Sequence, residues 1–248
     1  MITDYLAQAA SRLQSIADAA RGGELDAAVS LMVEAITAGG VVQAFGTGHS
    51  EAFAMEIAGR AGGLIPTNRI ALRDIVLHGS RDATVLGGSG LERDPAVVDE
   101  LFAISPINPA DVFVIASNSG VNGSIVGVAL KAKELGHPVI AVTSLEHTNA
   151  VEPKHPSGKR LSEIADVVID NRAPYGDATL ELPGGIGVGA ISSITAAFIA
   201  QLLTIGVAQR IAADGSTPPV YISANIPGGD EHNRVLEDLY RDRIRRDA

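Results

Sequence analysis

Apolar and polar residues form blocks along this chain that differ in length and in period. Short runs that are apolar almost throughout recur, and longer segments between them repeat apolar residues every three or four positions. The short runs are typical of strands buried on both faces of a parallel sheet, and the longer segments of helices that cover it. The pattern predicts an α/β fold, a three-layer αβα sandwich around a five-stranded parallel sheet. We expect its strands at residues 41–45, 64–66, 111–116, 139–142 and 167–169.

Further helices are predicted at both ends of the chain. Residues 3–20 carry a narrow apolar stripe, which favours packing against another helix in the same chain or in a second subunit. A second helix is expected at residues 25–38. We therefore expect a single domain over residues 1–248, with an N-terminal helical segment at 1–40 and a C-terminal arm at 214–248.

Three segments are harder to interpret. Residues 68–93 contain several glycines, and long loops of this kind often form lids or the walls of sites. A long helix is expected from about Val188 to Ala213, followed by an extended segment and a final charged helix. The stretch at 182–209 lacks charge, but its glycines and the absence of basic anchors at both ends favour a buried core helix over a membrane span.

Composition and charge exclude several classes of function. The net charge is −10 and only 4% of residues are aromatic, so the chain offers neither a basic surface nor a stacking surface for nucleic acid. There is no cysteine, which removes disulfides, thiolate metal sites and cysteine nucleophiles. The first residues do not resemble a signal peptide, and we expect a cytoplasmic protein that makes no contact with a membrane.

Two turns rich in glycine and hydroxyl groups follow two of the predicted strands. They are G-T-G-H-S at residues 46–50 and S-N-S-G-V-N-G-S at 117–124, and each leads into a predicted helix. Such turns direct backbone N–H groups at an anion, most often phosphate. A Rossmann fingerprint, a P-loop and a nucleophile elbow are excluded, because the third glycine, the lysine and the final glycine that they require are missing. The predicted phosphate group comprises Gly48, Ser50, Ser117, Ser119, Asn122 and Thr143, although serine and asparagine here could simply cap helices.

Glu56 is the leading candidate for proton transfer. It lies more than one turn inside the helix that follows the first turn, among Phe53, Ile57 and other apolar residues. A carboxylate in such surroundings can act as a general base near neutral pH. The alternative is an ordinary surface ion pair with Arg60 at i+4. Glu51 is a weaker candidate, because its carboxylate would repel a phosphate.

Histidines supply further candidates. His232 can exchange protons near neutral pH, and Asp230 could orient it or merely cap the final helix. His49 and His155 are secondary pocket candidates. No histidine forms a recognised metal-binding spacing, so neither a metal nor another cofactor is expected.

The motifs G-T-G-H-S, S-N-S-G-x-N, R-A-G-G-L and G-G-D-E-H-N together resemble the sugar isomerase (SIS) domain family over nearly the whole chain. The similarity is to bacterial SIS proteins of the phosphoheptose isomerase type, and it implies the flavodoxin-like SIS fold and a phosphorylated sugar as ligand. In M-E-I-A-G-R, Glu56 matches the catalytic glutamate of an E-x-x-G-R segment, although about one helical turn fewer separates it from the first turn. Asn122 stands where many family members carry threonine or serine.

The resemblance leaves three functions open. The first is an aldose–ketose sugar-phosphate isomerase with a glutamate base. The second is a lyase, a dehydratase or etherase that acts on an N-acetylhexosamine 6-phosphate, and the third is a sensor that binds a sugar phosphate without turning it over. The resemblance also implies a homodimer or homotetramer with shared sites, in which His232 approaches Glu56 of another chain.

Overall fold

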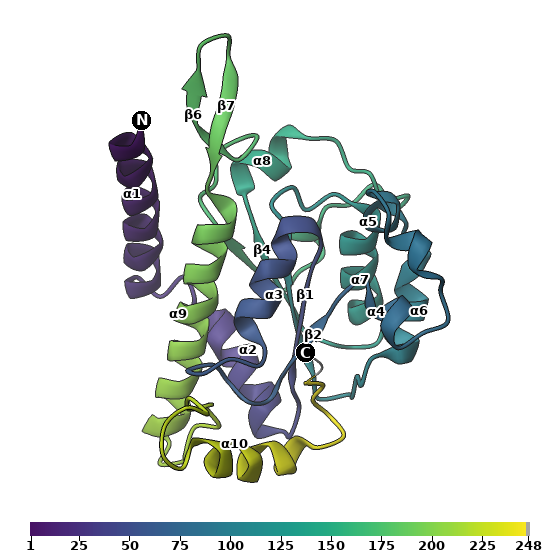
Figure 1. Cartoon of the computed structure of the whole chain (residues 1–248), viewed down its shortest axis with the longest axis vertical. Helices are drawn as coiled ribbons and strands as arrows, with labels where there is room; N and C mark the ends of the chain where they lie inside the picture. The colour runs from purple at the N-terminus through teal and green to yellow at the C-terminus, as the bar shows by residue number, and fades with distance from the viewer. Residues whose placement is uncertain (247–248) are drawn as a thin grey trace.

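A parallel sheet of five strands forms the centre of the molecule. In the computed structural model, which describes residues 1–246, the strand order is β2-β1-β3-β4-β5 and all neighbours pair in parallel (Figure 1). Every residue of β1, β3 and β4 is buried, as their continuous apolar sequences predict. The expected α/β fold is therefore confirmed. The strands are β1 (Val42–Gly46), β2 (Thr67–Ile70), β3 (Val112–Ala116), β4 (Val139–Thr143) and β5 (Val167–Asp170).

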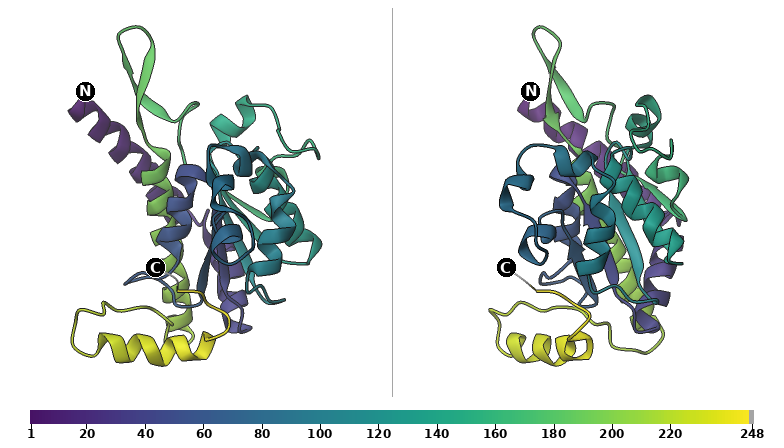
Figure 2. Two further views of the ribbon diagram at one scale, coloured as in Figure 1. Left: turned by 45° about the vertical axis from the view of Figure 1, so that its right-hand side comes forward. Right: turned by 90° about the vertical axis from the view of Figure 1, so that its right-hand side faces the viewer.

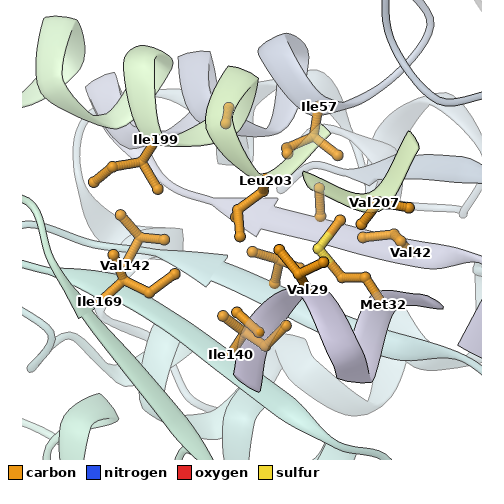
Figure 3. Packing of buried hydrophobic residues seen from close by; sticks show 14 of the residues in the cluster. Val29, Met32, Val42, Ile57, Ile140, Val142, Ile169, Ile199, Leu203 and Val207 are labelled. Atoms are coloured by element: carbon orange, nitrogen blue, oxygen red, sulfur yellow. The ribbon is translucent and has the colours of Figure 1, made fainter. Parts of the chain in front are cut away.

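Helices cover both faces of this sheet and give it three layers (Figures 1 and 2). On one face, helices α2, α3 and α9 build a core in which Ile199, Leu203 and Val207 of α9 face β-strand residues such as Val142 (Figure 3). On the other face, α4, α6 and α7 enclose a second core against β3 and β4. The helices are α1 (Ile2–Arg21), α2 (Asp26–Thr37), α3 (Glu51–Ile57), α4 (Asp74–Leu77), α6 (Val97–Ile104), α7 (Gly123–Glu134) and α9 (Ser192–Ala213).

The strand order has a switch point between β1 and β3. The chain leaves β1 towards α3 on one face and leaves β3 towards α7 on the other. In sheets of this order, ligands bind outside the carboxyl ends of the two strands where the direction of winding reverses. Both glycine- and hydroxyl-rich turns lie at this point.

The second strand lies three residues beyond its predicted position. The prediction placed it at residues 64–66, whereas β2 starts at Thr67. Leu64 instead forms a single antiparallel bridge with Val220. The sequence did not reveal β2 because it is polar, and the partners of its polar side chain are distant in the chain: the Asn68 side-chain amide donates to the carbonyl of Arg243 and accepts from the N–H of Arg245.

A β-hairpin stands where the long helix was expected to begin. Strands β6 (Ala178–Leu182) and β7 (Ile186–Ala190) project from the sheet, and α9 starts only at Ser192 (Figure 1). Gly184 and Gly185 form the tip with φ angles of +93° and +78°, which glycine adopts at little cost. The prediction of a helix from Val188 was wrong, because Val188 to Ala190 are the last residues of β7, whose apolar residues resemble those of the helix that follows.

The glycine-rich segment at 68–93 is shorter and more regular than expected. After β2 it contains α4, a 3-10 turn η2 (Ala83–Leu86) and a short helix α5 (Gly90–Arg93) that contacts α7. The polar insertion after β4 likewise contains α8 (Leu145–Ala150) and the 3-10 turn η3 (Leu161–Glu163). These segments form walls around the carboxyl end of the sheet.

Helix α9 is long and apolar enough to span a membrane by length and composition. It packs instead on α1, α2 and α3 and contributes Ile199, Leu203 and Val207 to the core (Figure 3). Core helices of soluble proteins pass the same test of composition, and this packing agrees with the predicted core helix.

A buried carboxylate fastens the C-terminal arm to the opposite end of the sheet. The arm carries α10 (Gly229–Glu237) and the 3-10 turn η4 (Asp238–Tyr240) and then crosses the edge of β2. Asp111 is fully buried and accepts hydrogen bonds from the N–H groups of Val41 and Asn108 at 2.9 Å and from the Gln43 amide at 2.8 Å. Arg243 completes the set at 2.7 Å. Because donors from both the sheet and the arm bind this one carboxylate, it holds the arm against the sheet.

We predict that Asp111→Ala lowers the free energy of unfolding by about 3–5 kcal/mol, because it leaves three N–H donors at a buried position without their acceptor and the half-buried guanidinium of Arg243 without its counter-charge. Urea denaturation measures the change. Asp242→Ala is the matched control, since it removes an exposed carboxylate from the same arm and should change stability by no more than about 0.5 kcal/mol. Equal stability of the two variants would contradict the assigned role of Asp111.

Candidate functional site

The first turn connects β1 to α3 and depends on two glycines. A Cβ atom on Gly46 would lie 2.3 Å from the carbonyl oxygen of Ser50, so the turn closes only with glycine there. Gly48 has a φ of +55° and begins the 3-10 turn η1 (Gly48–Ser50). His49 is exposed and Ser50 is half-buried, and neither side chain has a hydrogen-bond partner among residues 1–246. The turn therefore presents a free hydroxyl at the end of β1.

The second turn connects β3 to α7, and its conformation is held by hydrogen bonds that Ser117 and Thr143 make. The Ser117 hydroxyl accepts a hydrogen bond from the N–H of Gly120 at 3.1 Å, and Gly120 has a φ of +64°. Thr143 is fully buried, and its hydroxyl donates to the carbonyl of Asn118 at 3.3 Å. Thr143 thus holds the turn in shape and is not exposed to a ligand, whereas the half-buried Ser119 has no side-chain partner within the described part of the chain.

The two turns meet along a narrow crevice at the carboxyl ends of β1 and β3, where Gly46 and Ala116 are partners in the sheet. The water-accessible volume of the crevice is about 10 Å³, roughly the space of one water molecule. An anion larger than water must therefore lie at the mouth of the crevice or widen it. The lining residues are His49, Ser50, Phe53, Ala116, Ser117, Asn118, Val142, Asn171, Ser192, Ser193 and Ala196.

Residues outside the two predicted turns also form this crevice. Asn171 at the end of β5 donates to the Asn118 side chain at 3.1 Å. Ser192 and Ser193 enter from the N-terminus of α9, where Asp177 accepts the N–H and the hydroxyl of Ser192, both at 2.7 Å. The helix end is thereby satisfied by the chain's own carboxylate. Local sequence could not indicate these contacts, because they join segments far apart in the chain.

Glu92 is a functional candidate that the sequence interpretation missed. It lies on α5, and its carboxylate accepts a hydrogen bond from the Asn122 amide at 2.5 Å. Its other oxygen lies 3.6 Å from the position of a Cβ added to Gly48. Glu92 therefore lies between the two turns, with one carboxylate oxygen at Asn122 and the other near Gly48. Its neighbours in sequence resemble a simple loop, and only the fold brings it to the site.

Glu56 lies beside the crevice, outside its lining. Its carboxylate accepts a hydrogen bond from Gln201 of α9 at 2.6 Å and pairs with Arg60 one helical turn further on. The i+4 pair that was the alternative interpretation thus exists, and Gln201 is a partner that the sequence did not reveal. Glu56 is six residues beyond Ser50, which corresponds to about 9 Å along a helix.

The remaining predicted site residues lie elsewhere in this chain. His232 is on α10, which lies at the opposite end of α9 from the crevice, and its imidazole contacts the carbonyl of Val220 at 3.0 Å (Figures 1 and 2). Asp230 is exposed in the first turn of α10. His155 packs near Gly127 of α7 and hydrogen-bonds Ser157, and desolvation lowers the pKa of its imidazole. None of the three is among the residues that line the crevice, although the N–H of Lys154, next to His155, donates to the carbonyl of Val121 in the second turn.

A larger cavity of about 440 Å³ lies at the edge of β2. Four arginines line it, but two of them hold the arm in place: Arg246 donates to the carbonyls of Ile65 and Thr67, and Arg245 donates to that of Ile104. The turns and their hydroxyls are absent from this cavity. We therefore assign the candidate site to the crevice.

The chemistry available at the crevice is hydrogen bonding without a formal positive charge. Hydroxyls and amides line it, and neither lysine nor arginine is among the lining residues. Helix α7 begins at Gly123, further along the second turn. Over residues 1–246, the structure has no group of three His, Cys, Asp or Glu side chains arranged to hold a metal. An oxyanion such as phosphate is the ligand that such donors bind.

Comparisons with known proteins agree with this geometry. A UPF0309 protein of Geobacillus kaustophilus is 38% identical over 221 residues, covering 89% of this chain and 86% of the relative. A UPF0309 protein of Listeria innocua is 36% identical over 98% of this chain and 97% of its own length. The solved phosphoheptose isomerase of Francisella tularensis superposes with a TM-score of 0.53 at 18% identity, over 84% of this chain and 96% of that one, which shows a shared fold. Residues 4–144 match the SIS domain. The chain therefore belongs to the SIS domain family and, by its sequence relatives, to the UPF0309 proteins.

Proposed function

We propose that this protein is an enzyme that acts on a phosphorylated sugar, most simply an aldose–ketose isomerase of the phosphoheptose isomerase type in the cytoplasm. The observation that carries the proposal is the meeting of the two turns at the switch point of the sheet. Ser50 and Ser119 present hydroxyls without protein partners, and α7 begins directly after the second turn. These groups would hold the phosphate, and the shared fold of the solved phosphoheptose isomerases supports the same ligand class.

In this proposal Glu56 is the general base. The spacing of about 9 Å between Ser50 and Glu56 along α3 is comparable with the length of an extended sugar phosphate. A phosphate at the turns would therefore place the reacting carbons near the carboxylate, which would move a proton between adjacent carbons through an enediol. Gln201 and Arg60 hold that carboxylate in position.

Two other functions use the same site. A lyase acting on an N-acetylhexosamine 6-phosphate needs the same first step, removal of a proton beside a carbonyl or imine. A sensor would bind a sugar phosphate without changing it. Incubation with a panel of sugar phosphates in deuterated water, followed by NMR, separates them: an isomerase gives deuterated aldose and ketose, a lyase gives an eliminated product, and a sensor gives only a shift in melting temperature.

We further propose that the working unit is a homodimer or homotetramer whose sites are completed across subunits. Leu6, at the start of the predicted apolar stripe on α1, is 67% exposed, so part of that stripe has no partner in the described part of this chain. Helix α10, which carries His232, lies at the far end of α9 from the crevice of its own chain (Figures 1 and 2), so a catalytic role of His232 would require another subunit.

We expect Ser119→Ala to weaken sugar phosphate binding by about 1.5–3 kcal/mol without altering the fold, because it removes one hydrogen bond to a charged ligand. Calorimetric titration with the members of the panel that bind measures the loss. Ser216→Ala, which removes an exposed hydroxyl beyond the far end of α9, is the matched control and should bind normally. Equal affinity of both variants would remove Ser119 from the site.

Glu56→Gln keeps the shape of the side chain and can still accept the hydrogen bond from Gln201, but it cannot accept a proton. Turnover of the active sugar phosphate should fall at least about a hundredfold while binding persists. Glu51→Gln on the same helix is the control, because Glu51 pairs with Arg73 outside the crevice and should not carry the reaction. Near-normal turnover in Glu56→Gln would make Glu56 structural.

Shared sites predict that two inactive variants restore activity when their subunits exchange. Glu56→Gln and His232→Gln are suitable partners, since glutamine at 232 keeps a donor for the Val220 carbonyl. Mixed assemblies should recover part of the parental turnover, because some sites receive both intact residues. Full activity of His232→Gln alone would exclude His232 from the chemistry, and no recovery after proven exchange would exclude shared sites.

A further inference from the structure

A carboxylate stands between the two turns that are proposed to bind phosphate. Glu92 accepts the Asn122 amide at 2.5 Å, and its second oxygen faces Gly48 of the first turn. An anion at the mouth of the crevice would therefore share its immediate surroundings with a second negative charge.

The backbone of Glu92 is fixed in this position. Its carbonyl accepts a hydrogen bond from the Ser124 hydroxyl at 2.8 Å. The next carbonyl, that of Arg93, lies so close to Gly123 that a Cβ atom there would approach it to 2.1 Å. Because α5 rests directly on the first turn of α7, the carboxylate is held at the site by packing that only glycine permits.

The charge of Glu92 has no compensating cation. Over residues 1–246 the structure contains no ion pair to Glu92, whereas Glu51 on the neighbouring helix pairs with Arg73. The amide oxygen of Asn122 is buried and has no hydrogen-bond partner. Within the described residues, the Glu92 carboxylate is therefore stabilised by one side-chain amide and by no cation.

We propose that Glu92 belongs to the binding site and takes up one proton from solvent when a dianionic phosphate binds between the turns. This inference rests on the proposed function, which places the phosphate there. Two negative charges that share a site disfavour each other, and protonation of the carboxylate relieves the repulsion. No bond forms to the ligand: the proton moves from water to a Glu92 oxygen, and the neutral acid remains beside Asn122. Anion affinity then rises as pH falls.

Other titratable groups near α5 have to be separated from this effect. His49 on η1 carries an imidazole and lines the crevice, so the test is made in a His49→Gln protein. The remaining charged groups on the packed elements are exposed, paired or capping: Arg93 on α5, Asp82 before η2 with its pKa lowered by hydrogen bonds from Thr84, Asp94 bonded to the Ala96 N–H, and Lys131 and Lys133 paired with Asp99 and Asp166 at the far end of α7. His155 lies beside Gly127 of α7 and hydrogen-bonds Ser157, and desolvation lowers the pKa of its imidazole; it is present in both proteins that are compared.

Sulfate is the appropriate probe, because it has the shape and charge of phosphate but does not titrate near neutral pH. We expect Glu92→Gln to bind sulfate on the order of tenfold more tightly than the His49→Gln parent at pH 8, and the difference to narrow as pH falls towards 5. Calorimetric titration at constant ionic strength measures both affinities. In the parent, the binding heat should also depend on the ionisation enthalpy of the buffer, and this dependence should disappear in Glu92→Gln.

Glu134→Gln is the matched control, because it removes the same charge from the far end of α7 and should change sulfate affinity by less than about twofold at any pH. Weaker binding by Glu92→Gln, or a gain that does not vary with pH, would overturn the inference. Absence of sulfate binding to the parent, or binding that Ser119→Ala leaves unchanged, would instead overturn the proposed phosphate site on which the inference rests.

Discussion

The candidate site exists because the chain leaves two neighbouring strands towards opposite faces of the sheet. β1 and β3 pair directly, yet the chain continues from β1 to α3 on one face and from β3 to α7 on the other. The two turns therefore diverge and leave a crevice that neither helix can fill. Gly46 is essential to this arrangement, since any side chain there would collide with the carbonyl of Ser50 and open the first turn.

Anion binding at this crevice has to work against the charge of the whole protein. The chain carries a net charge of −10, and its crevice contains no lysine or arginine. Charges farther than about 8 Å are largely screened at physiological ionic strength, so local dipoles and hydroxyls decide the outcome. Two carboxylates shape that local field: Asp177 satisfies the N-terminus of α9, whereas Glu92 stands uncompensated between the turns. A site of this kind selects ligands by directed hydrogen bonds more than by charge.

Local patterns were sufficient for the parts of the fold that are held together locally. The apolar runs of β1, β3 and β4 and the turns after two of them appear directly in the sequence. The sequence does not reveal β2 in this way, because the hydrogen-bond partners of its Asn68 side chain are Arg243 and Arg245 near the end of the chain. The same reason hid Glu92, whose contact with Asn122 spans 30 residues. For Glu56, periodicity indicated the correct helix, but Gln201 became visible only when α9 was packed against it.

Glu56 and His232 lie too far apart within one chain to act on the same substrate. Gln201, which contacts Glu56, is midway along α9, while His232 lies beyond its C-terminal end. A helix of 22 residues is about 33 Å long and does not fold back on itself. Within one chain His232 is therefore a structural residue that holds the Val220 carbonyl. A two-fold axis roughly perpendicular to α9 would place the α10 end of one subunit beside the crevice end of the other, which is the arrangement that the proposed shared site needs.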